Sequence, residues 1–138
     1  MRHSVLHDRG RIEYVSSVLV VDDGPLVRRK VCEMLTREGG FNICGEAENG
    51  SEAIEKAQRL RPDLIIMDWA MPVMNGVEAA QLLKRSLPSI PIIIFSNYTD
   101  AFVKKLALSM GVTAVISKSQ HFSILVKTAR GLLLQSAA

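Results

Sequence analysis

Five residues of types that can do chemistry come after short apolar runs of the sequence. Asp22 and Asp23 follow the first run, Asp68 follows the third, and Ser96 and Lys118 come after the fourth and fifth. Three carboxylates that lie together repel one another, so a cation must offset their charge. A hard divalent ion such as Mg²⁺, which takes carboxylate and water oxygens as ligands, suits this set.

The same residue types indicate phosphoryl chemistry. A carboxylate can attack a phosphoryl group and form an aspartyl-phosphate. The Ser96 hydroxyl can hydrogen-bond a phosphoryl oxygen, and the Lys118 ammonium can neutralise it as a point charge. Taken singly, each residue has a structural explanation, because Asp-Asp-Gly-Pro makes a good turn and an isolated Ser or Lys is commonly a surface residue. Their shared position after separate apolar runs favours one common site.

The apolar runs predict the strands that position these residues. The runs are continuous rather than alternating, which is typical of parallel strands buried on both faces. They are Val18–Val21, Phe41–Cys44, Leu64–Met67, Ile92–Phe95 and Val112–Ile116. Apolar residues recur with helical spacing between and after them, as at Phe102, Leu106 and Met110. Right-handed crossovers then put helices on both faces of a parallel sheet, whose ligands bind at the carboxyl ends of the strands.

Glycine and proline mark the expected helix ends. Pro25 follows Gly24 at a first-turn position that tolerates a missing N–H, and Pro62 and Pro88 close the second and third helices. Gly39-Gly40 and Gly111 stand where helix ends are expected. The 138 residues suit one α/β domain over residues 16–136, preceded by a mobile tail over residues 1–15.

Composition excludes several other classes of protein. The excess of 17 basic over 14 acidic residues is too small to indicate a nucleic-acid surface, and the run Arg28-Arg29-Lys30 is interpreted as the solvated face of a helix. Cys32 and Cys44 lack the spacing of a zinc site or a disulfide framework. No apolar stretch approaches the roughly 20 residues of a membrane span, and the N-terminus is too polar for a signal peptide. We expect a cytoplasmic protein with no membrane and no direct nucleic-acid partner.

The spacing of the motifs resembles the receiver domain of bacterial two-component response regulators. The resemblance is carried by Val-Leu-Val-Val-Asp22-Asp23, by Asp68-Trp-Ala-Met-Pro-Val-Met-Asn-Gly76, and by Ser96 and Lys118, over residues 16–136. It implies a doubly wound, five-stranded parallel sheet with five helices and the flavodoxin-like strand order 2-1-3-4-5. It also implies that Asp68 accepts a phosphoryl group from a sensor histidine kinase or a phosphotransfer protein.

The resemblance assigns roles to the other site residues. It implies that Mg²⁺ is held by Asp22, Asp23, Asp68 and the backbone carbonyl of Ala70, with Asp22 acting largely through water. Ser96 senses the phosphoryl group and Lys118 pairs with it. It further implies that the domain catalyses its own phosphoryl transfer and slow autodephosphorylation without being a conventional enzyme. It also implies that a downstream protein, or a second copy in a homodimer, binds the face formed by the fourth helix, fifth strand and fifth helix.

Three positions depart from the family pattern. Val115 stands where an aromatic residue is common, Asn97 where a small residue is common, and Ser119 where proline is common, so Ser119 is expected to cap the last helix. Tyr98 is expected to shield the aspartyl-phosphate from water. These departures keep open a pseudo-receiver that binds proteins without phosphorylation, and the isolated receiver of a LuxR-type transcription regulator. The sequence has neither the D-x-D motif of haloacid-dehalogenase hydrolases nor a Walker loop.

Overall fold

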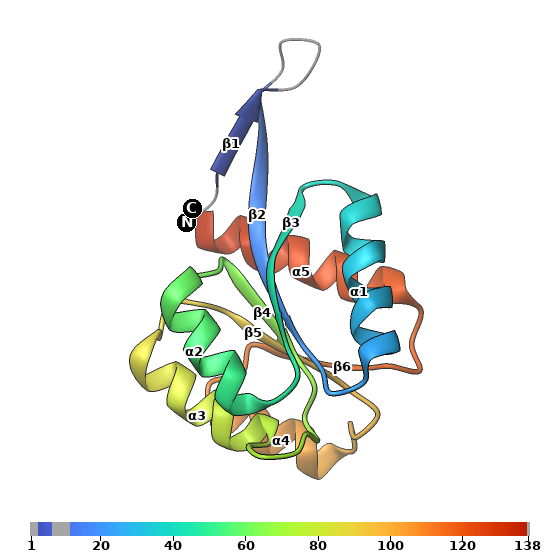
Figure 1. Cartoon of the computed structure of the whole chain (residues 1–138). Helices are drawn as coiled ribbons and strands as arrows, with labels where there is room; N and C mark the ends of the chain where they lie inside the picture. Colours follow the sequence, from blue (N-terminus) through green and yellow to red (C-terminus); the bar gives the residue numbers. More distant parts are fainter. Residues whose placement is uncertain (1–2, 7–11, 138) are drawn as a thin grey trace.

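A parallel sheet of five strands forms the centre of the computed structural model, which describes residues 3–6 and 12–137 (Figure 1). The strands are β2 (Ile12–Val21), β3 (Phe41–Ala47), β4 (Leu64–Met67), β5 (Ile92–Ser96) and β6 (Ala114–Ser117). They lie side by side in the order β3-β2-β4-β5-β6, and each pair is parallel. Counting the parallel strands along the chain, this is the predicted order 2-1-3-4-5, which is therefore confirmed.

Five helices cover the two faces of the sheet, as the doubly wound prediction requires. They are α1 (Pro25–Glu38), α2 (Gly50–Leu60), α3 (Gly76–Ser86), α4 (Ala101–Ser109) and α5 (Phe122–Ala137). The first and last helices pack on one face, and the other three pack on the opposite face (Figure 1). None of the described helices is both long and apolar enough to cross a membrane.

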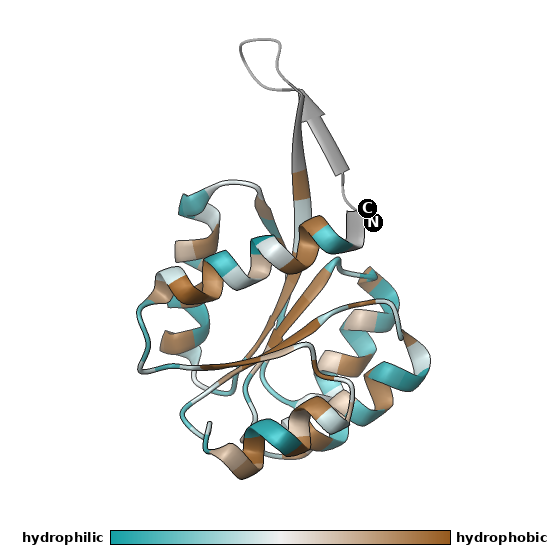
Figure 2. Ribbon diagram, turned by 180° about the vertical axis from the view of Figure 1, so that it is seen from behind, coloured by the Kyte–Doolittle hydropathy of each residue, from teal (hydrophilic) through white to brown (hydrophobic). Residues whose placement is uncertain are grey.

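Alternating strand residues fill two separate cores, which explains why the strand sequences are continuously apolar. Leu19 and Ile65 pack toward α2, α3 and α4, whereas Val18 and Leu64 pack toward α1 and α5. Figure 2 shows the central strands as predominantly hydrophobic. The two cysteines pack against different cores, Cys44 against the first and Cys32 against the second. The sheet thus separates their thiols.

Most helix ends lie where glycine and proline predicted them. Gly24 is the N-cap of α1 with Pro25 in its first turn, and Leu87, just before Pro88, ends α3. Arg61 ends α2 in the left-handed region, at φ 49°, immediately before Pro62. The other helix starts use side-chain caps, whose oxygens accept backbone N–H groups of the first turn. These caps are Asn49, Asn75 and Asp100.

The prediction that Ser119 caps the last helix is wrong. Its backbone N–H donates to Ser117 Oγ at 3.1 Å, and the helix begins three residues later. His121 takes the capping position instead, because its Nδ1 accepts the N–H of Ser123 at 3.1 Å. A ring nitrogen that accepts a hydrogen bond satisfies one of the free donors of the first turn in the same way as a carboxylate.

The N-terminal segment differs from the predicted tail. β2 begins at Ile12 rather than Val18, and β1 (His3–Leu6) pairs with it antiparallel, from His3 opposite Val15 to Leu6 opposite Ile12. This hairpin projects beyond the body of the domain (Figure 1). The expectation of a tail is wrong for these strand residues, and residues 1–2 and 7–11 lie outside the described part of the chain.

Candidate functional site

The carboxyl ends of the parallel strands bring the predicted site residues to one edge of the sheet. Asp22 directly follows β2 and Asp68 directly follows β4, and the register pairs the preceding residues, Val21 and Met67. Ser96 ends β5, and Lys118 directly follows β6. Strand pairing therefore sets the spacing of residues that are far apart in the sequence.

Three carboxylates form a tight cluster at this edge. Oxygens of Asp22, Asp23 and Asp68 all lie within 4.8 Å of one another. Asp22 is 5% exposed and Asp68 is 7% exposed, whereas Asp23 is exposed to solvent. The cluster is thus buried on the side of the sheet and open to solvent on the side of Asp23.

Lys118 supplies a positive charge to the cluster. Its Nζ lies 2.7 Å from Asp22 Oδ2 and 3.2 Å from Asp68 Oδ2, so one ammonium bridges two carboxylates. Burial alone lowers the pKa of Lys118. The hydrogen bond to Asp22 and the charge of Asp68 outweigh burial, so the pKa lies above its ordinary value. Lys118 is therefore charged throughout the neutral range.

Both carboxylate oxygens and the backbone carbonyl of Asp22 have partners, whereas the Asp23 carboxylate has none in the described part of the chain. The N–H of Gly24 donates to Asp22 Oδ1 at 2.8 Å, Lys118 binds Oδ2, and Arg28 donates to the Asp22 carbonyl at 2.7 Å. Within the described ranges, the Asp23 carboxylate has no hydrogen-bond or ion-pair partner. Asp23 is therefore the carboxylate most available to a further ligand.

Asp68 is oriented by the loop that follows it. Its Oδ1 accepts the N–H of Trp69 at 2.7 Å, and the carbonyl of Trp69 accepts the N–H of Gly76 at 2.8 Å. A Cβ at Gly76 would lie 2.5 Å from the carbonyl oxygen of Asp68, so a residue with a side chain cannot approach this closely. Ala70 is exposed in the same loop, two residues after Asp68.

Ser96 lies at the site edge with its hydroxyl in a local hydrogen bond. The side chain is fully buried, its Oγ accepts the N–H of Tyr98 at 3.2 Å, and its carbonyl accepts the N–H of Lys118 at 2.9 Å. Tyr98 is 60% exposed, so its ring does not lie packed over the carboxylates in this state. Val115 is half-buried and packs against the core under α2, α3 and α4. An aromatic residue is common at this position in receiver domains.

Arg28 was not predicted as a site residue. The run that contains it was interpreted as a solvated helix face, which is wrong for Arg28, since its side chain is 19% exposed and turned toward Asp22. Its Nε also lies 3.0 Å from Glu46 Oε1, on β3. The only sequence feature that could have linked Arg28 to the site is its position six residues after Asp22, in the first turn of α1.

Comparison with known proteins agrees with this geometry. Residues 18–130 match the response regulator receiver domain family. The chain is 37% identical over 113 residues to the response regulator protein VraR of Staphylococcus saprophyticus, covering 82% of this chain and 54% of that protein. The chain thus spans about half the length of VraR and of a second curated relative from Bacillus subtilis.

Solved structures give the same assignment. The signal receiver domain of the response regulator NarL from Mycobacterium tuberculosis superposes with a TM-score of 0.81 at 28% identity, covering 86% of this chain and 96% of that one. A LuxR-family two-component response regulator from Aurantimonas superposes with a TM-score of 0.85 at 25% identity, covering 88% and 86%. The motifs, the strand order and the strand-end cluster agree with these matches: the chain belongs to the response regulator receiver domain family.

Proposed function

We propose that this chain is a phosphorylation-activated switch in which Asp68 accepts a phosphoryl group from a phosphohistidine of a sensor kinase or phosphotransfer protein. The observation that carries the proposal is the cluster of Asp22, Asp23 and Asp68, in which Lys118 bridges the two buried carboxylates, Asp22 and Asp68. Receiver domains bind Mg²⁺ in an acidic pocket, and this acidic cluster supports the same role here. The cytoplasm, where sensor kinases present their phosphohistidine, is the proposed location.

Asp68 suits the role of nucleophile better than its neighbours. Asp23 lies on the exposed side of the cluster, and Asp22 is the more tightly paired of the two buried carboxylates, because Lys118 Nζ lies 2.7 Å from its Oδ2 and 3.2 Å from Asp68 Oδ2. Attack by an Asp68 oxygen forms the P–O bond as the P–N bond to the donor imidazole breaks, and the imidazole leaves with the electron pair. Lys118 then pairs with the phosphoryl oxygens, and the Ser96 hydroxyl turns from Tyr98 to donate to one of them.

The donor set fits Mg²⁺. Carboxylate oxygens are hard ligands, and Asp23 is without a partner in the described part of the chain, so its oxygens are available to a cation. The proposed ligands are Asp23, Asp68, the Ala70 carbonyl and, largely through water, Asp22. The chemistry that Mg²⁺ supplies in such a site is neutralisation of the charge on the phosphoryl oxygens.

A cleft beside Lys118 suits the approach of the phosphodonor. It has a volume of about 460 Å³ and runs between α1 and the segment joining β6 to α5. Its walls combine apolar side chains such as Val27 and Phe122 with the cations Lys30 and Lys118. Apolar walls with a positive rim fit an amphipathic helix that carries a phosphorylated histidine.

The output surface is proposed on α4, β6 and α5. Phe102 is 74% exposed and Leu134 is 65% exposed, although they are large apolar residues. Phosphorylation shifts the population toward a state in which a downstream protein or a second copy covers this face. The transcriptional regulatory protein LnrK of Bacillus subtilis is 34% identical over 110 residues, which make up 50% of its length, and the Aurantimonas structure belongs to the LuxR family. These matches favour a second candidate: the receiver of a LuxR-type DNA-binding regulator.

Intact mass after incubation with Mg²⁺ and acetyl phosphate tests the proposal. We expect a gain of one phosphate in the parent and in Asp63→Asn, which alters a buried aspartate at the opposite end of β4, and none in Asp68→Asn. A gain in Asp68→Asn would place the nucleophile elsewhere. If neither the parent nor either variant gains a phosphate, with acetyl phosphate or with phosphoramidate as the donor, a pseudo-receiver that binds proteins without phosphorylation would be favoured.

A further inference from the structure

Arg28 links the acidic cluster to a neighbouring strand. One terminal nitrogen of its guanidinium donates to the Asp22 carbonyl at 2.7 Å, while Nε donates to Glu46 Oε1 at 3.0 Å. The first acceptor belongs to the turn after β2, and the second lies on β3. The guanidinium is planar and its donors have fixed directions, so the two bonds together restrict where the Asp22 carbonyl points.

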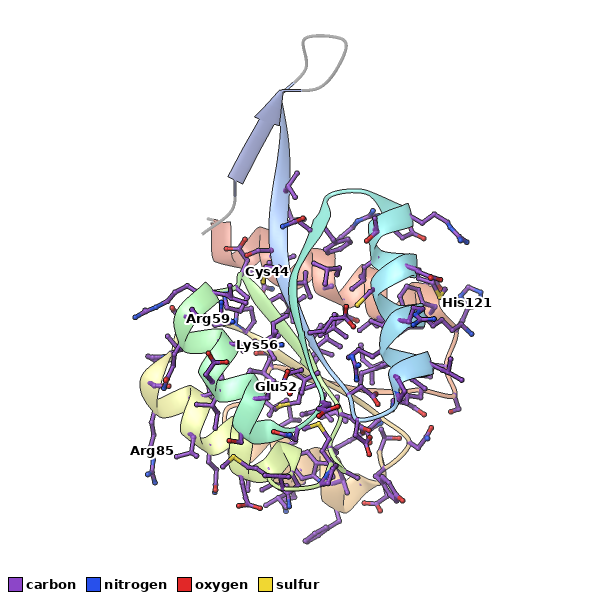
Figure 3. The ribbon with its side chains drawn as sticks, viewed as in Figure 1. Cys44, Glu52, Lys56, Arg59, Arg85 and His121 are labelled. Atoms are coloured by element: carbon purple, nitrogen blue, oxygen red, sulfur yellow. The ribbon has the colours of Figure 1, made fainter. Side chains whose placement is uncertain are left out.

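The backbone of Glu46 is also fixed by a hydrogen bond of its own. Its carbonyl accepts a hydrogen bond from Lys56 of α2, and the same ammonium lies 2.7 Å from Glu52 Oε1. Figure 3 shows Lys56 and Glu52 together on α2. A continuous set of contacts therefore runs from the Asp22 carbonyl through Arg28, Glu46 and Lys56 to Glu52.

The Asp22 carbonyl belongs to the peptide plane that it shares with the N–H of Asp23. Because a peptide unit is rigid, fixing this carbonyl also fixes the direction in which the chain enters Asp23. The Asp23 side chain has no partner of its own in the described ranges, so its placement depends on the backbone. Arg28 donates to the carbonyl of this peptide, and its side chain is 19% exposed.

We propose that Arg28 and Glu46 are a positioning pair that orients the Asp22–Asp23 peptide and thereby sets the affinity of the acidic pocket for Mg²⁺. The inference rests on the proposed function, because it assumes that Asp23 is a ligand. It is separate from any effect of the Arg28 charge. The charge alone repels a cation, so its removal strengthens Mg²⁺ binding, whereas the loss of positioning weakens it.

Arg28→Lys separates these two effects. Lysine keeps the positive charge but lacks the planar guanidinium, so it cannot donate to the Asp22 carbonyl and to Glu46 Oε1 in the same directions. Residues that orient metal ligands typically change affinity by 10–100-fold, and we expect about tenfold weaker Mg²⁺ binding in Arg28→Lys. Glu46→Gln should weaken binding less, and the double variant should resemble Arg28→Lys alone, because both changes break the same contact.

Trp69 provides the readout. It is the one tryptophan of the sequence and follows Asp68, so its fluorescence reports on Mg²⁺ titrated into the pocket. The matched control is Arg59→Lys, labelled in Figure 3, whose Nε lies 3.2 Å from Glu55 Oε1 on the exposed face of α2. We expect the control to bind Mg²⁺ like the parent, and phosphorylation of Arg28→Lys to approach the parental rate once Mg²⁺ saturates.

The outcomes distinguish the two proposals. If Arg28→Lys lowers the melting temperature but leaves the dissociation constant for Mg²⁺ unchanged, Arg28 is structural and the positioning role is overturned while the proposed function stands. If the parent itself shows no saturable response to Mg²⁺ and gains no phosphate, the proposed function fails, and the positioning role fails with it.

Discussion

The short strand β4 has a buried aspartate at each end, and the two have opposite surroundings. Asp63 precedes the strand and is 8% exposed, while Asp68 follows it and is 7% exposed. The Asp63 carboxylate accepts hydrogen bonds from the backbone N–H of Ser17 at 2.8 Å and from its hydroxyl at 3.2 Å. Asp68 instead faces two further carboxylates and one ammonium.

The difference separates an aspartate held by local hydrogen bonds from one whose surroundings suit the proposed phosphoryl chemistry. At the amino edge, Ser17 and Asp63 each donate to the other, because the N–H of Asp63 also donates to Ser17 Oγ at 3.1 Å. At the carboxyl edge, negative charges are gathered beyond what Lys118 alone can neutralise. Burial by itself therefore does not identify a functional aspartate in this sheet, and the charges around it do.

Loss of Lys118 should produce the largest change in stability. Lys118→Met leaves Asp22 and Asp68 together without their counter-charge, and breaking such a buried pair typically costs about 3 kcal/mol. Because the folded pKa of Lys118 is raised, its contribution is present across neutral pH and is lost only as pH rises through that pKa. Urea unfolding measures the loss, and excess Mg²⁺ should recover part of it.

Lys84 offers the control for this experiment. It is half-buried and donates to the carbonyl of Ile90 at 2.8 Å, burial lowers its pKa, and no carboxylate of the described residues pairs with it. Lys84→Met should therefore be insensitive to Mg²⁺. An equal response of both variants to Mg²⁺ would show that the ion acts elsewhere on the protein.

Asp63→Asn should destabilise the protein by about 2 kcal/mol, because it weakens charge-assisted hydrogen bonds at a buried position. Phosphorylation of the folded protein should be unchanged, since Asp63 lies at the far end of β4. Urea unfolding followed by circular dichroism measures the first effect, and intact mass with acetyl phosphate measures the second. A loss of phosphorylation in a folded variant would contradict the division between the two edges.

Asp68→Asn should change stability in the opposite direction. Removing one of three clustered carboxylates relieves repulsion while the amide still accepts the N–H of Trp69, so we expect a gain of about 1 kcal/mol without Mg²⁺. The gain should vanish when excess Mg²⁺ stabilises the parent. Thermal unfolding with and without Mg²⁺ measures both effects, and a destabilised Asp68→Asn would mean that Lys118 already balances the cluster.

The five parallel strands could be predicted because their burial on both faces leaves continuous apolar runs. β4 has the predicted bounds, Leu64–Met67. β2 extends further than predicted because Ile12–Val15 mixes polar and apolar residues and is paired by β1, a strand of four residues. Such short pairing depends on backbone hydrogen bonds, which leave little pattern in a sequence.

The carboxylate cluster could be predicted for a related reason: parallel strands end at one edge, so residues after them meet. Contacts that depend on how a helix lies over the sheet could not be predicted in this way. Arg28 has the sequence context of an exposed helical charge, and only the approach of α1 to Glu46 turns it inward. Asp63 likewise belongs to no motif, since its partner Ser17 is 46 residues away in the chain.

Val73 should give the smallest effect, and it tests whether the carboxyl edge also stores backbone strain. This β-branched residue has a positive φ of 68° in the loop between β4 and α3, and it is 83% exposed. It is the central residue of a three-residue turn, closed by the N–H of Met74 and the carbonyl of Pro72 at 2.7 Å. Asparagine tolerates this backbone region, so Val73→Asn should raise the free energy of unfolding by up to about 1 kcal/mol. The control is Val73→Thr, which keeps the branched Cβ and should leave the urea midpoint unchanged. If threonine gave the same gain in stability as asparagine, the gain would come from removing an exposed apolar side chain and not from relief of strain beside Asp68.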